Sequence, residues 1–311
     1  MRSPQHKAVL MASFVVLAWA TVATAFKIAL SGMSTALLLL IASVTTLLIA
    51  FFEVVRCGMI KNVLASMKDK RGLLLNMSMG LLNPFLYYLI LFKAYSLLPA
   101  QIAQPINFSW QIVLILLLAV VMKERLRIGV MIGVAVSFGG VLILSTNNSA
   151  STDGILSVTG IILTIISTFI WASYWVFNLK SKEGSTVSLF KNFFFGTVYL
   201  LIFVVIYPES LSFNGVSILS GNFPDLKPLL AAIYTGCFEM GITFILWGKA
   251  LQFSTNRAIL TQLTYLAPVI SLFIIYFVLG ETISLYTVIG LSLIIVGLLI
   301  STLRIIPVTS K

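Results

Sequence analysis

The sequence predicts an all-α polytopic membrane protein in which ten transmembrane helices form two inverted five-helix repeats. Three observations predict this fold. Hydrophobic residues make up 59% of the 311 residues and charged residues only 9%, which is more apolar surface than a soluble core can bury. Apolar stretches long enough to cross a bilayer recur along the chain, and the second half of the chain repeats features of the first.

Ten apolar stretches reach the roughly 20 residues that a helix needs to cross a ~30 Å hydrocarbon layer. Those of the first half are residues 8–29, 34–55, 73–92, 101–122 and 128–146. Those of the second half are residues 157–179, 187–207, 229–251, 256–279 and 284–303. Helices are expected because unpaired backbone groups are too costly in lipid and because the stretches lack the alternating pattern of a transmembrane barrel.

The basic residues predict the orientation of each helix, because cytoplasmic loops of membrane proteins carry an excess of Lys and Arg. If the helices alternate in direction, sixteen of the 20 basic residues fall on one side: Arg2, Lys7, Arg56, Lys61, Lys68, Lys70, Arg71, Lys123, Arg125, Arg127, Lys180, Lys182, Lys249, Arg257, Arg304 and Lys311. The other side receives Lys27, Lys93 and Lys227, and Lys191 lies just inside the seventh stretch. Both termini are therefore expected in the cytoplasm.

The internal repeat is visible in two places. Residues 79–94 (MGLLNPFLYYLILFKA) align without a gap with residues 235–250 (TGCFEMGITFILWGKA), and both segments have a glycine near the start and Lys-Ala at the end. A glutamate followed by glycines 9 and 16 residues later occurs at Glu124 and again at Glu281. These matches predict that one membrane unit occurs twice in the chain.

The two predicted units are residues 1–150, with the first five helices, and residues 151–311, with the last five. Because five is odd, the second unit enters the membrane in the opposite orientation. The charges agree, since the loop at Glu124 is rich in Lys and Arg whereas the loop at Glu281 has none. Inverted repeats are typical of secondary transporters, in which two similar halves exchange conformations around a site at mid-depth.

Composition and motifs disfavour several other functions. The net charge of +11 comes from basic residues dispersed among short loops, which fits membrane topology and anionic lipid headgroups better than nucleic-acid binding. The single histidine, His6, lies in the N-terminal tail, and the sequence has no metal-binding cluster, phosphate-binding loop or nucleophile elbow. We therefore expect a chain that is not an enzyme, with no metal, no cofactor and no nucleic-acid partner.

Two segments resemble a known family. Residues 263–299 (LTYLAPVISLFIIYFVLGETISLYTVIGLSLIIVGLL) resemble the last two helices of EamA-type proteins of the drug/metabolite transporter superfamily, and residues 106–144 are a weaker match to the same pattern. Trp19 with Lys27, and Trp171 with Lys180, match the first helix of each half. The resemblance implies a central cavity, export of amino acids, other small metabolites or drugs without ATP, and a place in the bacterial inner membrane.

Glu239 is the one acidic residue near the centre of a predicted helix. An ionised side chain at that depth costs about 2.5–3.5 kcal/mol on insertion scales, so such residues usually face a cavity or the bundle interior. Two functional roles follow as hypotheses: Glu239 carries a coupling proton, or it pairs with a cationic group of the substrate. The structural alternative is a permanently protonated carboxyl that bonds to a neighbouring helix.

Polar residues at helical spacing follow one face of four predicted helices. They are Asn76, Gly80, Asn83 and Tyr87 on the third, Gln104, Asn107 and Gln111 on the fourth, Gly236, Glu239 and Thr243 on the eighth, and Thr261, Thr264 and Pro268 on the ninth. We expect these faces to line a cavity, with hydrogen bonds between packed helices as the alternative.

Aromatic residues add a second set of candidates. Trp171 and Tyr174 share a face of the sixth helix, while Trp110 and Tyr265 lie within the fourth and ninth. Deep aromatic rings can stack on a planar substrate or hold a cation, and the alternative is a place in packing or in interfacial belts. Trp19 and Trp247 are weaker candidates.

The sequence as a whole predicts a secondary active transporter that exports or exchanges a small metabolite, amino acid-like or otherwise amphipathic, by alternating access. Its partners are then a small-molecule substrate and the lipid bilayer, with the proton as a candidate coupling ion. Helices three, four, eight and nine would line the cavity, with contributions from one and six. The alternatives are a passive channel, a lipid- or drug-handling membrane protein and, with least support, a membrane-embedded enzyme.

Overall fold

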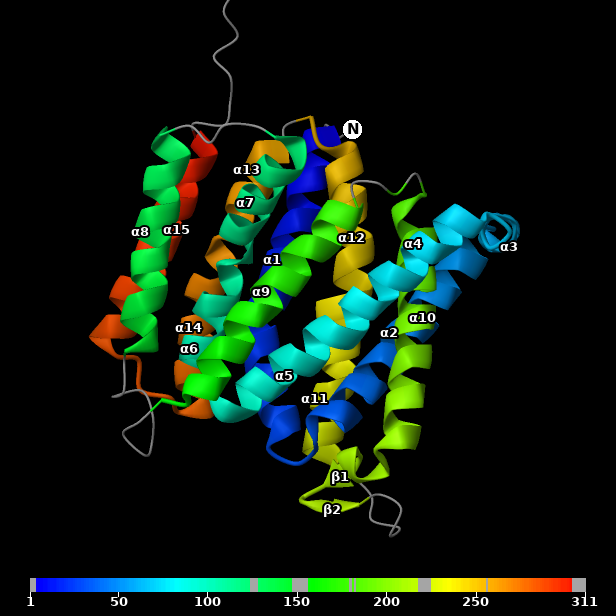
Figure 1. Ribbon diagram of the computed structural model, residues 1–311, viewed down its shortest axis with the longest axis horizontal. Coiled ribbons are helices and arrows are strands. Elements are labelled where there is room, and N and C mark those ends of the chain that lie inside the picture. Colours follow the sequence, from blue (N-terminus) through cyan, green and yellow to red (C-terminus); the bar gives the residue numbers. More distant parts are fainter. Residues whose placement is uncertain are drawn as a thin grey trace, which may run out of the picture.

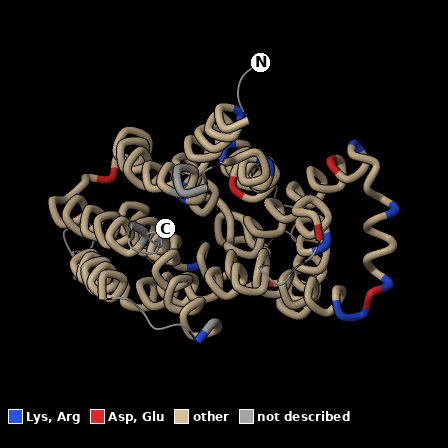
Figure 2. Tube along the Cα trace, turned by 90° about the horizontal axis from the view of Figure 1, so that it is seen from above, with Lys and Arg blue, Asp and Glu red and all other residues tan. Residues whose placement is uncertain are grey.

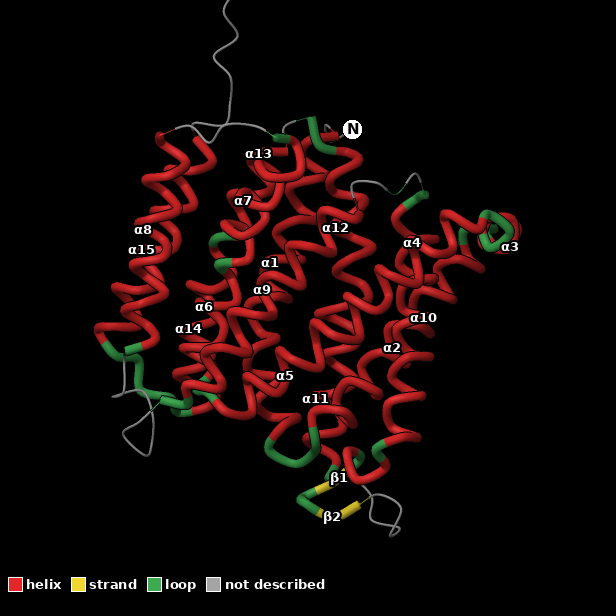
Figure 3. The backbone as a smooth tube through the Cα atoms, in the orientation of Figure 1, coloured by secondary structure: helices red, strands yellow, loops and turns green. Residues whose placement is uncertain are grey.

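The computed structural model describes residues 4–123, 128–146, 156–178, 181, 183–217, 225–255 and 257–303. These residues form a bundle of long helices with a short two-stranded hairpin at its lower end (Figure 1, Figure 3). The prediction of a helical membrane protein is confirmed, since the described residues include nine helical segments long and apolar enough to cross a membrane.

The first half of the chain is helical throughout its described part. Its elements are α1 (Pro4–Leu30), α2 (Thr35–Arg56), α3 (Ile60–Ser66), α4 (Lys70–Gly80), the π-helical turn η1 (Leu81–Leu86), α5 (Tyr87–Leu97), α6 (Ala100–Phe108), α7 (Trp110–Met122) and α8 (Ile128–Ser145). The third predicted helix is thus a run of α4, η1 and α5, and the fourth is a run of α6 and α7.

The second half contains the hairpin and the remaining helices. Its elements are α9 (Val158–Asn178), α10 (Ser185–Ile206), the 3₁₀ turn η3 (Pro208–Ser210), β1 (Ser212–Phe213), β2 (Val216–Ser217), α11 (Leu226–Thr235), the π-helical turn η5 (Gly236–Gly241), α12 (Ile242–Phe253), α13 (Arg257–Thr264), α14 (Leu266–Leu279) and α15 (Leu285–Leu303). The tenth predicted helix coincides with α15, whose described apolar run, Leu285–Ser301, is shorter than the other nine. That α15 crosses the membrane stays a prediction.

The inner helices are broken at matching positions in the two halves. The third predicted helix is interrupted by η1, where Pro84 supplies no N–H donor and Asn83 has non-helical backbone angles (φ −142°, ψ 118°). The eighth is interrupted by η5 at the equivalent place. Breaks at Ser109 and Tyr265 separate α6 from α7 and α13 from α14, and these breaks lie 156 positions apart (265 minus 109), as the aligned segments of the repeat do. Irregular backbone at membrane depth is tolerated where it is buried in protein or lines a cavity.

Helices α8 and α15 lie side by side at one edge of the bundle (Figure 1). Small residues allow their backbones to approach closely: a Cβ on Gly133 would lie 2.5 Å from the carbonyl oxygen of Gly297. Ser137 adds a hydrogen bond from its hydroxyl to the Ile294 carbonyl oxygen, at 3.0 Å. In lipid, such close packing replaces the hydrophobic effect as the force that holds helices together.

This packing gives a first testable prediction, for two neighbouring glycines on α8. A Cβ on Gly140 would lie 2.5 Å from the Gly290 carbonyl oxygen, whereas a Cβ on Gly139 would meet nothing within 4 Å. Gly140→Ala is therefore expected to destabilise the protein by about 1–3 kcal/mol, a usual cost of overpacking, while Gly139→Ala serves as the matched control. Thermal unfolding in detergent measures both variants, and equal midpoints would contradict the packing.

The bundle has two distinct ends. At the hairpin end, β1 pairs antiparallel with β2 and Met33 forms a bridge to Phe213. At the opposite end, called here the termini end, α1 begins and α15 finishes (Figure 1). Seen from above, Lys and Arg residues gather along the edge of the bundle near α3, and few charged residues lie among the helices (Figure 2).

Candidate functional site

A cavity of about 400 Å³ lies between the helices of the two halves. Its walls come from α1, α5, α6, α7, α9, η5, α12, α13 and α14, with a contribution from α15. Nine of the side chains expected to line a cavity do so: Glu239, Tyr87, Gln104, Asn107, Trp110, Gln111, Trp171, Thr264 and Tyr265. A cavity of this size is typical of small-molecule sites.

Glu239 lies in η5, where the helix is irregular, and lines the cavity. The Tyr88 hydroxyl donates a hydrogen bond to its carboxyl atom Oε1 at 3.0 Å. The backbone carbonyl of Glu239 accepts hydrogen bonds from the Thr243 hydroxyl at 2.9 Å and from the Trp19 indole N–H at 3.4 Å. Tyr88 on α5 therefore contacts the carboxyl group itself, while Trp19 on α1 contacts the backbone that carries it.

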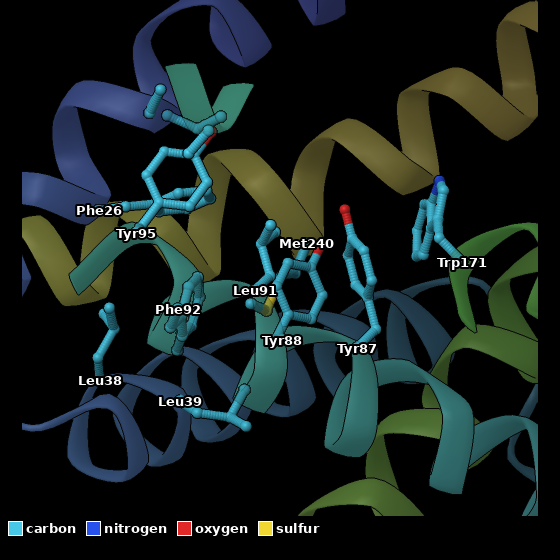
Figure 4. Packing of buried hydrophobic residues seen from close by; sticks show 14 of the residues in the cluster. Phe26, Leu38, Leu39, Tyr87, Tyr88, Leu91, Phe92, Tyr95, Trp171 and Met240 are labelled. Atoms are coloured by element: carbon cyan, nitrogen blue, oxygen red, sulfur yellow. The ribbon is translucent and has the colours of Figure 1, made fainter. Parts of the chain in front are cut away.

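A chain of hydrogen bonds joins three helices beside this carboxyl. The Tyr87 hydroxyl donates to Asn107 Oδ1 at 3.1 Å, and Asn107 Nδ2 donates to the Ser167 hydroxyl at 3.0 Å. The Tyr87 ring also stacks on Trp171, with centroids 4.5 Å apart and an interplanar angle of 25°. Figure 4 shows Tyr88, Tyr87 and Trp171 in sequence along this wall. The contacts connect α5, α6 and α9 and hold the polar groups at fixed positions.

All five tryptophans of the chain line the cavity: Trp19, Trp110, Trp171, Trp175 and Trp247. Trp171 lies at the centre of this wall, edge-on to Trp110 and Trp175 at 6.1 Å each. Trp110 and Trp175 stack on each other at 6.2 Å, and Trp19 lies 5.6 Å from Trp247. The residue pattern ranks Trp19 and Trp247 as weaker candidates, and the structure adds Trp175 to the lining. The sequence contains one feature that all five share: each lies inside an apolar stretch. This position is unusual, because tryptophan in membrane helices usually lies at the interfaces.

Three predicted site residues lie outside the lining of this cavity. Asn83 is buried at η1, and neither polar atom of its side chain has a hydrogen-bond partner among the described residues. Tyr174 is buried and accepts a hydrogen bond from Asn192 Nδ2 on α10, at 3.5 Å. Thr243 is buried and bonds to the Glu239 carbonyl. A fourth, Thr261, belongs to α13, and its side chain lies outside the described part of the structure.

At the hairpin end, buried aromatic rings and two charged residues back the cavity. Phe26 packs against Tyr95 with centroids 5.2 Å apart. Lys27 Nζ donates to the carbonyl oxygens of Tyr95 and Leu98 at 3.1 and 3.0 Å. The Glu281 carboxylate accepts from the backbone N–H groups of Ala100 and Gln101, at 2.9 and 3.0 Å, and so caps the start of α6. These contacts connect α1, α5, α6 and the turn before α15.

Toward the termini end the lining continues along α7 and α12. It includes Leu114 and Ile115 on α7 and Trp247 and Leu251 on α12. The ion pair nearest this side joins Lys249 on α12 to Glu53 on α2 at 2.7 Å, and Arg56 bonds to the same carboxylate at 2.8 Å. These charged side chains lie toward the ends of α2 and α12, outside the lining. Among the described residues of the lining, Glu239 is the one Asp, Glu, Lys or Arg residue.

Comparisons with known proteins agree with this architecture. The profile of the EamA-like transporter family matches residues 6–146 and 158–303. A solved structure described as a crystal structure of a protein is similar with a TM-score of 0.66 and 19% identity, covering 98% of this chain and 100% of the other, which indicates a shared fold.

Three relatives are similar in sequence. A Salmonella typhimurium protein named "Probable amino-acid metabolite efflux pump" is 26% identical over 94% of this chain and 93% of its own. An "Uncharacterized transporter in sor 3'region" of Acidianus ambivalens is 27% identical over 75% of this chain and 87% of its own. An "Uncharacterized transporter" of Clostridium kluyveri is 26% identical, and the match spans 58% of this chain and 56% of that relative.

Proposed function

The chain belongs to the EamA-like transporter family, and from this premise we propose that it is a secondary active transporter that exports or exchanges a small amphipathic metabolite by alternating access. The observation that carries the proposal is the cavity itself. It lies between helices of both halves, it is walled by aromatic rings, and it contains one carboxyl group, Glu239, with a fixed position. A relative named as an efflux pump for amino-acid metabolites supports the direction and the kind of substrate.

The proposed architecture has ten membrane-spanning helices in two inverted halves, residues 1–150 and 151–311. The recurrence of the helix breaks supports it, and so does the double match of the family profile. A further correspondence supports it: Lys123, which follows α7, and Gly280, which follows α14, both have left-handed backbone angles and lie 157 positions apart (280 minus 123). In this architecture α15 is the tenth spanning helix.

The proposed orientation places the termini end in the cytoplasm of a bacterium and the hairpin end on the far side of its inner membrane. The distribution of basic residues supports it. In this orientation the contacts of Lys27 and Glu281 lie on the far side of the membrane. Alternating access then requires these contacts at the hairpin end to open when the termini end closes.

Glu239 is the proposed site of proton coupling. It is the one charged residue among the described residues that line the cavity, and intramembrane carboxyl groups that face a cavity commonly carry protons in transporters. The Tyr88 hydroxyl donates to one carboxyl oxygen of Glu239, and the Glu239 side chain also lines the cavity.

Flux measurements in proteoliposomes test the proposed function. With a panel of amino acids, amines and aromatic metabolites, at least one compound is expected to show saturable flux that an imposed pH gradient increases several-fold. Flux that stays proportional to concentration and ignores the gradient would instead identify a passive channel. The control is an identical vesicle preparation without protein, which reports passive leakage of each compound.

A further inference from the structure

The charges around the cavity are unequally distributed. Glu239 lines it, whereas the two nearest lysines that the structure describes are engaged at the ends of the bundle. Lys27 donates to backbone carbonyls at the hairpin end, and Lys249 pairs with Glu53 toward the termini end. The described lining contains no Lys, Arg or His side chain. A ligand in this cavity therefore meets a carboxyl group and has no cationic partner among these residues.

From this distribution we infer that the cavity selects an amphipathic organic cation: an amine with an aromatic or other planar apolar part and without a carboxylate group. The inference rests on the proposed function and specifies the substrate class of the same site. Its amine would pair with the carboxyl of Glu239, and its ring would lie among the tryptophans around Trp171.

The aromatic wall suits a cation as well as a ring. The faces of aromatic rings carry partial negative charge and attract an ammonium group within about 6 Å, most strongly at tryptophan. Trp171 stacks on Tyr87 and on Phe244, with centroids 4.5 and 5.8 Å apart. Tyr87 lies on α5 beside Tyr88, and Phe244 lies on α12, which continues from the turn η5 that holds Glu239. Glu239 and all three rings line the same cavity.

Two further polar atoms in the lining are buried and have no hydrogen-bond partner among the described residues: the side-chain oxygen of Gln104 and the indole N–H of Trp175. Gln104 Oε1 accepts hydrogen bonds, and ammonium groups offer three donors. The Trp175 N–H can donate to a neutral acceptor such as a hydroxyl oxygen. Buried polar groups are normally paired, so these two atoms indicate where a bound amine and a polar ring substituent would be held.

The described lining has no basic side chain. This disfavours an amino acid, which carries an α-carboxylate in addition to the amine and the ring. Its carboxylate would lose water on entering the cavity and would lie in the same space as the carboxyl group of Glu239. Removing a charge from water without a compensating partner is costly, and discrimination often depends on such a repulsive element. An amine that lacks the α-carboxylate avoids both costs while it keeps the ring and the ammonium group.

Tryptophan fluorescence of the purified protein tests the inference directly, because all five tryptophans line the cavity. Four ligands with the same phenyl ring are compared: phenethylamine, N-methylphenethylamine, phenylalanine and 3-phenylpropionate. The two amines, which are cations without a carboxylate, are expected to bind at least about tenfold more tightly than the other two. Equal or tighter binding of phenylalanine or of 3-phenylpropionate would overturn the inference, and so would the absence of binding by both cations.

Two variants isolate the role of the carboxyl group. In the Glu239→Gln variant, the Kd values of phenethylamine and of neutral 2-phenylethanol are expected to differ by no more than about threefold. The variant is expected to retain its binding of 2-phenylethanol. Glu209→Gln, at an exposed glutamate in η3, should bind as the unaltered protein does. If Glu239→Gln kept the full preference for the cations, the assignment would be wrong.

Flux and binding separate the two proposals. Selective binding of cations without saturable flux would retain the cation site and reject the transporter. Saturable flux of phenylalanine or 3-phenylpropionate, with no preference for the amine, would retain the transporter and reject the cation site.

Discussion

Replacing Glu239 by glutamine is expected to lower proton-driven flux at least tenfold and to remove its dependence on pH. Glutamine keeps the length of the side chain and can accept the hydrogen bond from Tyr88, but it cannot bind or release a proton. The other titratable groups near this carboxyl are the hydroxyls of Tyr87, Tyr88 and Tyr95 on α5. The ion pairs among the described residues join Glu53 to Arg56 and Lys249, and Glu183 to Lys191, and none of them includes Glu239.

The measurement is initial flux in proteoliposomes between pH 6 and pH 8, with and without a pH gradient. Glu209→Gln is again the matched control, because it removes a carboxyl group of equal size from an exposed turn. A Glu239→Gln variant with normal flux and an unchanged pH profile would show that the carboxyl is a structural group bonded to Tyr88, and that proton coupling, if present, resides elsewhere.

The second large effect is expected at Lys191, outside the cavity. Its side chain is fully buried on α10, where it pairs with Glu183 and donates to the Ser66 hydroxyl at 3.1 Å. Glu183 also accepts from Asn76 Nδ2 at 3.3 Å. This network connects α3, α4 and α10. Lys191→Met leaves Glu183 without its cation, and breaking a buried pair in this way costs about 3 kcal/mol or more.

Unfolding of the purified protein in mixed micelles measures this cost. Lys227→Met, at an exposed lysine near the start of α11, is the control and is expected to change stability little. The double variant Lys191→Met with Glu183→Gln should recover part of the loss, because it removes both charges together. A Lys191→Met protein as stable as the Lys227→Met protein would mean that the pair contributes nothing.

Lys191 also shows a limit of sequence interpretation. Counting basic residues left it unassigned just inside an apolar stretch, because a single lysine in such a place suggests neither side of the membrane. Its explanation is Glu183, eight residues earlier, and Ser66 on a helix far away in the sequence. The pairing within the second half could have been proposed from spacing, whereas the contact with α3 required the fold.

The polar face of the third helix shows a second limit. Asn76, Asn83 and Tyr87 lie on one stripe if the helix is continuous, but η1 intervenes and changes the direction of the side chains beyond it. Tyr87 consequently lines the cavity, while Asn76 bonds to Glu183 and Asn83 lies outside the lining. In the second half Glu239 lines the cavity, whereas Thr243 lies outside the lining and bonds to the Glu239 carbonyl.

The sequence by itself determined the class of the protein: a helical membrane protein of the EamA-like transporter family. It also singled out Glu239. The membrane class and the choice of Glu239 follow from apolar length and the cost of a charge in lipid, which are local properties of the chain. The family follows from the resemblance of residues 263–299 to its last two helices and from the match of its profile.

Only the tertiary structure decided what each helix face meets. Asn83 and Glu239 occupy equivalent positions of the repeat, yet one is buried at η1 outside the cavity lining and the other lines the cavity. The five tryptophans come from four helices, α1, α7, α9 and α12, and meet around one space. Periodicity fixes the side of a helix on which a residue lies, but helix breaks and neighbouring helices determine what that side contacts.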